Sequence, residues 1–177
     1  MDRQDNSNRT LQAYFFEAVH RSFASRLGVR GYDDVVSYLA AMLAVFARGD
    51  AIYAIRDADG RPVRTVAEML AEGDVRLNAD SFDREREVHQ HVGDYLLFWS
   101  GFFPEALVEH VGAGGLNDAI RQGKLSYSIV SSFDYGRYSD EAPTFRKLSD
   151  RFEVWRDGLE IVRSSFDGLR PPDPRVN

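Results

Sequence analysis

The 177-residue chain contains no cysteine, and this absence excludes disulfide bonds, thiolate metal sites and thiol nucleophiles. Positive charge is also in short supply, because 22 Lys and Arg stand against 28 Asp and Glu and leave a formal net charge of −6. An acidic chain without a basic cluster lacks the positive surface that nucleic-acid binding requires. We therefore expect no nucleic-acid partner.

Long hydrophobic runs are missing as well. The first ten residues, MDRQDNSNRT, are polar where a signal peptide would need an apolar run. The longest nearly apolar run covers residues 95–103, is interrupted by Ser100 and Gly101, and is far shorter than the ~20 residues of a membrane-spanning helix. These absences predict a soluble, cytoplasmic protein that has no membrane partner. The general character of the sequence is that of a bacterial protein.

The sequence motifs of common cofactor and nucleophile sites are also absent. The chain has no nucleophile elbow, no HExxH pattern and no glycine-rich phosphate loop. Residues 112–115 contain three glycines, but the Lys-Ser/Thr pair that completes a phosphate loop does not follow them. We expect no bound cofactor.

Apolar residues at helical spacing dominate what the chain does contain. One apolar face recurs over residues 11–27, and a clearer one over residues 35–46 repeats every three or four positions. Thr65 and Glu68 have the spacing of a capping box, in which each side chain bonds the other residue's backbone amide. This pair predicts a short helix that ends at Gly73.

Residues 50–56, DAIYAIR, are ambiguous. They fit either a helical turn or a strand that leads into a turn at Asp59 and Gly60. A single hairpin would be poorly supported in an otherwise helical chain, so the helical interpretation is favoured.

Together these patterns predict an all-α fold, a single-domain multi-helix bundle of about six to eight helices over residues 9–168. The polar residues 1–8 and the proline-rich residues 169–177 are predicted to be tails without regular secondary structure. Residues 88–103 and 145–166 are the most continuously apolar helical segments, and we expect them at the centre of the bundle.

The last helix has the most regular pattern in the chain. Its apolar residues alternate steps of three and four over three heptads, as in a coiled-coil seam: Phe145, Leu148, Phe152, Trp155, Leu159, Val162 and Phe166. Such a seam packs either inside its own bundle or against a second subunit. The bulky aromatic residues favour the intramolecular interpretation, and a homodimer through part of the seam is the alternative.

The charged half of a helix predicted over residues 81–101 holds candidate ligating residues. Glu85 lies four residues before His89, and a second glutamate lies four residues before His91, so each pair can touch. A Glu–His pair suits proton transfer or a divalent metal, and His110 is a further candidate ligand. Two ligands do not make a metal site, so none is assigned. The alternative is partly exposed hydrogen bonds on an ordinary helix.

Aromatic residues suggest a second kind of site. Residues 126–138 carry four serines and three tyrosines, and tyrosine combines apolar area with a polar tip. Tyr95, Trp99 and Tyr127 are predicted to line a pocket for an amphipathic small molecule. The alternative is that this segment is an amphipathic helix end followed by a turn.

Three classes of function remain after this reasoning. The favoured one is a non-enzymatic interaction or regulatory module that binds a protein partner or itself. The alternatives are a bundle that binds an amphipathic ligand and a metal-dependent enzyme that uses the Glu/His cluster. The candidate ligand-binding residues are Glu85, His89, His91, Tyr95, Trp99 and Tyr127.

Overall fold

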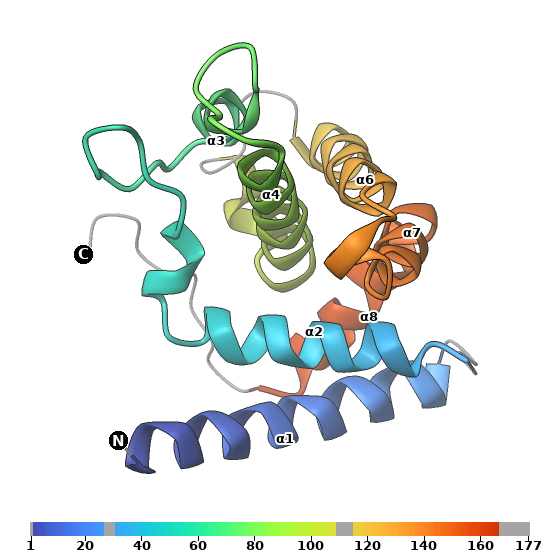
Figure 1. Ribbon diagram of the computed structural model, residues 1–177. Helices are drawn as coiled ribbons and strands as arrows, with labels where there is room; N and C mark the ends of the chain where they lie inside the picture. Colours follow the sequence, from blue (N-terminus) through green and yellow to red (C-terminus); the bar gives the residue numbers. More distant parts are fainter. Residues whose placement is uncertain (1, 27–30, 109–114, 167–177) are drawn as a thin grey trace.

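The computed structural model describes residues 2–26, 31–108 and 115–166 (Figure 1). Within these residues it has seven α-helices and no β-strand, which confirms the predicted all-α multi-helix fold. The helices are α1 (Asp2–Arg26), α2 (Asp33–Phe46), α3 (Val66–Gly73), α4 (Phe82–Phe102), α6 (Gly115–Ser132), α7 (Ala142–Asp150) and α8 (Phe152–Ser164). Three short 3-10 helices join them: η1 (Asp50–Tyr53), η2 (Pro104–Ala106) and η3 (Gly136–Tyr138).

The helices form two groups around α4. In Figure 1, α1 and α2 run side by side as one layer, and α4 lies above that layer between α3 and α6, with α7 beside α6. α4 packs against α3, α6 and α8, so the helix predicted to be central is central. No helix in the described part of the chain is both long enough and apolar enough to cross a membrane.

Local sequence explains where α4 begins and how closely it approaches α6. The Ser81 hydroxyl accepts a hydrogen bond from the Arg84 amide at 3.2 Å, which satisfies one of the free donors at the helix start. Gly93 lies against the ring of Tyr127, and a β-carbon added there would meet the ring at 2.6 Å. Only glycine allows the two helices to come this close with Tyr127 between them.

The heptad seam is buried inside the chain, as the intramolecular interpretation predicts. Six of its seven residues are almost fully buried, and Phe166 is half-buried. The single long helix predicted for this segment is wrong, because Arg151 leaves helical geometry and separates α7 from α8. A homodimer through these buried positions does not fit this packing, and self-association through another surface stays a prediction.

Two other local predictions differ from the structure. α1 begins at Asp2, so residues 2–8 are helical and do not form an irregular tail. In the ambiguous segment 50–56, Asp50–Tyr53 forms the 3-10 helix η1. Arg56 then forms an isolated antiparallel β-bridge with Pro62 across the turn. The segment therefore contains both the predicted helical turn and a short extended pairing. The predicted tail 169–177 lies outside the described residues.

Candidate functional site

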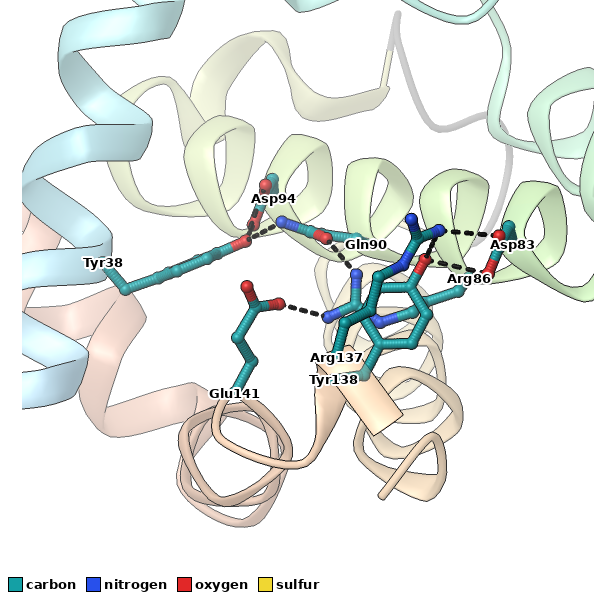
Figure 2. A network of polar contacts seen from close by, with 8 residues as sticks. All are labelled: Tyr38, Asp83, Arg86, Gln90, Asp94, Arg137, Tyr138 and Glu141. Atoms are coloured by element: carbon teal, nitrogen blue, oxygen red, sulfur yellow. Dashed lines mark hydrogen bonds and ion pairs between the residues drawn. The ribbon is translucent and has the colours of Figure 1, made fainter. Parts of the chain in front are cut away.

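A stripe of polar residues runs along one face of α4. Asp83, Arg86, Gln90 and Asp94 follow steps of three, four and four residues, so their side chains share one side of the helix. Figure 2 shows Tyr38 reaching this stripe from α2, and Arg137, Tyr138 and Glu141 reaching it from η3 and the start of α7.

Asp94 forms the inner end of the stripe. Tyr38 donates to its two carboxylate oxygens at 2.7 and 2.9 Å, and Tyr127 donates to one of them at 2.8 Å. Burial raises the pKa of Asp94 to about 7, and the hydrogen bonds from the two tyrosines act in the opposite direction. A carboxyl group that keeps its proton to higher pH than an exposed aspartate therefore lies between α2, α4 and α6.

Both tyrosines act as hydrogen-bond donors at this position. Burial and the neighbouring Asp94 raise the pKa of Tyr38 and the pKa of Tyr127 well above the usual value for tyrosine. Tyr127 is fully buried, whereas Tyr38 is half-buried. The hydroxyls stay protonated at neutral pH, so Asp94 is the titrating member of the cluster.

Hydrogen bonds connect this cluster to the surface. Gln90 donates to the Tyr38 hydroxyl at 3.1 Å and accepts from Arg86 at 3.1 Å. Arg86 also donates to Glu141 at 2.6 Å, and its guanidinium lies 4.0 Å from the centre of the Tyr138 ring. The Arg86 side chain is only 8% exposed, while that of Glu141 is 56% exposed. The network therefore runs from a half-buried acid to a solvent-facing one.

A surface cleft of about 460 Å³ lies beside the outer end of the network. Its charged side chains neutralise one another: Asp83 accepts from Arg137 at 2.6 Å and from Tyr138 at 2.8 Å. Arg84 pairs with Glu87 at 3.1 Å on the same wall. Because these charges are already paired, the cleft has no excess of either sign with which to attract a charged ligand.

Glu85, the first predicted ligand residue, lies on a different face of α4. It is half-buried in a shallow groove of about 400 Å³, which we call the α4–α6 groove. Phe82 and Tyr135 border the groove and are 65% and 59% exposed, whereas Phe133 is only 7% exposed. The residues that line it are Phe82, Glu85, Ile129, Ser132, Phe133 and Tyr135.

His89 faces α6. Its Nδ1 lies 3.4 Å from the Ser126 hydroxyl, which also accepts from Gln122 at 3.2 Å. Burial lowers the pKa of His89, although nearby Asp74 acts against this effect. A histidine beside a serine has the elements of an activated nucleophile, but Ser126 is fully buried and has no surface open to a substrate.

His91 faces η1 instead. Its Nε2 donates to the Ile52 carbonyl at 3.0 Å, and burial lowers the pKa of His91 to about 4. Glu85, His89 and His91 therefore contact three different surroundings. In the described part of the chain no group of three or more His, Cys, Asp or Glu side chains is placed to hold a metal ion. His110, the further candidate ligand, lies outside the described residues.

The three predicted pocket aromatics are fully buried core residues. Tyr95 donates to the Arg64 carbonyl at 3.4 Å and packs edge-on against Trp99, with ring centres 6.1 Å apart. Tyr127 packs between Phe145 and Phe152, at 5.9 and 6.0 Å. These are the contacts of a filled interior, and ligand binding by these side chains stays a prediction.

Sequence reasoning missed most of the polar network. His91 and Asp94 lie one turn apart on the same helix, yet the two side chains contact different elements. The step pattern of Asp83, Arg86, Gln90 and Asp94 was the available signal, because it places four polar residues on one face of a helix whose second half is buried. No local sequence pattern indicates that Tyr38 and Glu141 join this network, because both come from other parts of the chain.

Comparisons with models of known protein families, with curated proteins and with solved structures give no match to this chain. We therefore infer function from the geometry of the site.

Proposed function

We propose that the protein is a non-enzymatic interaction module that binds an amphipathic, basic helix of a partner protein in the α4–α6 groove. One observation carries the proposal: two large apolar side chains that line the depression, Phe82 and Tyr135, remain well exposed beside the buried Phe133. Aromatic residues around a small depression are typical of the anchor points of protein interfaces.

Charge supports a basic partner. The Glu85 carboxylate lies in the groove, and within the described residues no hydrogen bond or ion pair engages it. A half-buried carboxylate beside apolar side chains gains most from a cationic group that arrives with the ligand. The net charge of −6 acts in the same direction, because it attracts a basic segment over longer range.

The shape of the groove favours a helical ligand. It lies between the first turn of α4 and the end of α6, and its apolar residues come from both helices and from the segment that follows α6. An amphipathic helix can place apolar side chains at positions i and i+4 into such a groove and a Lys or Arg beside Glu85. The described residues offer no sheet edge to which a ligand could add as a strand.

A display library of helical peptides tests the proposal with the whole protein as bait. We expect enriched peptides to share an apolar i, i+4 pair flanked by Lys or Arg. Phe82→Asp and Tyr135→Asp should weaken their binding about ten-fold or more, because truncating or charging an interface anchor costs at least ~1.4 kcal/mol. Tyr14→Asp is the matched control, because Tyr14 is 55% exposed on α1, outside the groove, and should not change binding.

Two results would overturn the proposal. The first is a selected peptide that binds the Phe82→Asp protein as tightly as the unaltered one. The second is a concentration-dependent dimer, measured by light scattering, that Phe82→Asp abolishes, because the groove would then be covered by a second copy of this chain.

A further inference from the structure

The side of α1 that faces away from the bundle is exposed over about three turns. The opposite side is buried against the rest of the chain through Phe15, Val19 and Phe23. Two shallow depressions lie on the exposed side, and α1 forms the lower edge of the molecule in Figure 1. We call this surface the α1 outer face, and its residues are all exposed: Ala13, Phe16, Glu17, His20, Arg21 and Ala24.

We propose that the α1 outer face binds the same face of a second copy of this chain, with the two α1 helices antiparallel around a twofold axis. The face shares no residue with the α4–α6 groove. This dimer and the peptide binding proposed for the groove can therefore fail independently of each other.

The order of residues on the α1 outer face makes it complementary to itself. An alanine marks each end. Residues four apart share an edge of the helix, so Phe16 and His20 form an aromatic edge. Glu17 and Arg21 form a charged edge in the same way. In an antiparallel twofold pair each edge meets its own copy in reverse order, and each end alanine meets the alanine of the other end.

The charged edge favours this arrangement most strongly. The side chains of Glu17 and Arg21 are 76% and 80% exposed, and their nearest charged atoms lie 3.9 Å apart. In the antiparallel pair each Glu17 also meets Arg21 of the second copy, so four charges of alternating sign lie together. A parallel pair would place the charged edge against the aromatic edge and would lose this alternation. Electrostatic complementarity of this kind determines the orientation of two surfaces.

The aromatic edge supplies the apolar part of the contact. Phe16 is 39% exposed and stacks on His20 of its own helix, with ring centres 5.9 Å apart. In the dimer His20 of the second copy covers the exposed part of the Phe16 ring, and such ring pairs add to the burial of apolar area. The end alanines are short, so they allow the helix axes to approach to about 8 Å.

The contact is small because each chain contributes one helix face about 18 Å long. Interfaces of this size lie at the low end of specific complexes, and we expect a dimer that forms in the micromolar range. Its formation should therefore depend on protein concentration.

Light scattering of the whole protein over a concentration series tests the dimer. The measured mass should rise from the 20.1 kDa of one chain toward twice that value. Phe16→Asp and Glu17→Arg should each weaken the dimer about ten-fold or more, the second because it brings like charges together. Combining Glu17→Arg with Arg21→Glu restores every opposite-charge pair and should restore the dimer. Phe82→Asp is the matched control, because it changes an exposed phenylalanine outside this face and should have no effect.

Engineered cysteines test the antiparallel register without background, because the chain contains no cysteine. When the Ala13→Cys and Ala24→Cys proteins are mixed with oxidised glutathione, a disulfide should join one chain of each kind. Ala13→Cys alone should form this link at least about ten-fold more slowly, because its two copies would lie about 16 Å apart along the helices, beyond the reach of a disulfide.

Three results would overturn the proposal. The first is a protein that keeps the mass of one chain up to about 1 mM, where even a weak specific dimer would form. The second is a dimer that Phe16→Asp and Glu17→Arg leave unchanged, because another surface would then form it. The third is a disulfide that forms as fast in Ala13→Cys alone as in the mixture, because the helices would then not be antiparallel in this register.

Discussion

His91 and Asp94 lie one turn apart on α4, yet burial shifts their pKa values in opposite directions. The pKa of His91 falls to about 4, while that of Asp94 rises to about 7. Burial disfavours the charged form in both, and for an imidazole that means losing a proton whereas for a carboxyl it means keeping one. Between these values the folded protein holds both side chains neutral.

This relationship predicts an unusual pH profile of stability. The lowered pKa of His91 gives stability that is present above pH 6.5 and lost as pH falls through 4. The raised pKa of Asp94 gives stability that is present below pH 3.8 and lost as pH rises through 7. Between about pH 4.5 and 6.5 the two slopes oppose each other. Burial also lowers the pKa of His89, which adds a slope of the same sign as that of His91, so Asp94 offsets only part of the rise in the free energy of unfolding that urea titrations should show in this range.

Removing either group should expose the slope of the other. In Asp94→Asn the free energy of unfolding should rise with pH from 4.5 to 6.5 more steeply than in the unaltered protein, by at most ~1.4 kcal/mol per unit for the one proton removed. In His91→Gln it should rise less steeply than in the unaltered protein over the same range. Parallel profiles for the two variants would show that neither group carries the assigned shift.

The buried seam gives a prediction for packing. Trp155 is fully buried, and its indole N–H donates to the Lys147 carbonyl at 2.9 Å. Trp155→Ala should lower the free energy of unfolding by about 3–5 kcal/mol, because it leaves a cavity and removes the hydrogen bond of the indole. The exposed Leu77→Ala is the control and should change it by less than ~0.5 kcal/mol in urea titrations. A loss below ~1 kcal/mol for Trp155→Ala would contradict a buried seam.

Much of the fold was predictable because apolar spacing determines which helix faces are buried. The seam from Phe145 to Val162 and the apolar second half of α4 lie in the core as expected. The break at Arg151 was not predictable, because the heptad spacing continues across it and only tertiary packing interrupts the helix. The helix over residues 2–8 was not predictable either, because these residues are all polar and give no amphipathic pattern.

The candidate sites were harder to predict because contacts between distant segments define them. Glu85 was identified from its spacing to His89, but the structure assigns them to different surroundings. Asp94 receives its two tyrosines from positions 56 and 33 residues away in sequence, and no local pattern encodes such distances. Sequence spacing indicates which side chains share a helix face, whereas tertiary contacts decide what that face meets.

The close approach of α4 to α6 gives a further prediction. Gly93→Ala places a methyl group against the Tyr127 ring, where the β-carbon would meet the ring at 2.6 Å. We expect a loss of about 1–3 kcal/mol from overpacking. In a Tyr127→Leu background the same change should cost less, because the clashing ring is gone. A double-mutant cycle in urea measures this coupling, and purely additive losses would argue against the contact.

The ion pair between Arg86 and Glu141 gives the last prediction, because its two partners differ so much in burial. Glu141→Gln removes the charge that balances a guanidinium with only 8% of its side chain exposed. The expected loss of stability is about 1–3 kcal/mol, since a buried charged donor loses its charged partner.

Asp118→Asn is the matched control, because it breaks the pair between Asp118 and Arg121, whose side chains are 42% and 80% exposed. That exposed pair should contribute less than ~0.5 kcal/mol. Raising the salt concentration should weaken the Asp118 pair more than the Glu141 pair, because water and ions screen only charges that they can reach. Equal losses for the two variants would mean that Arg86 does not depend on Glu141 in the folded protein.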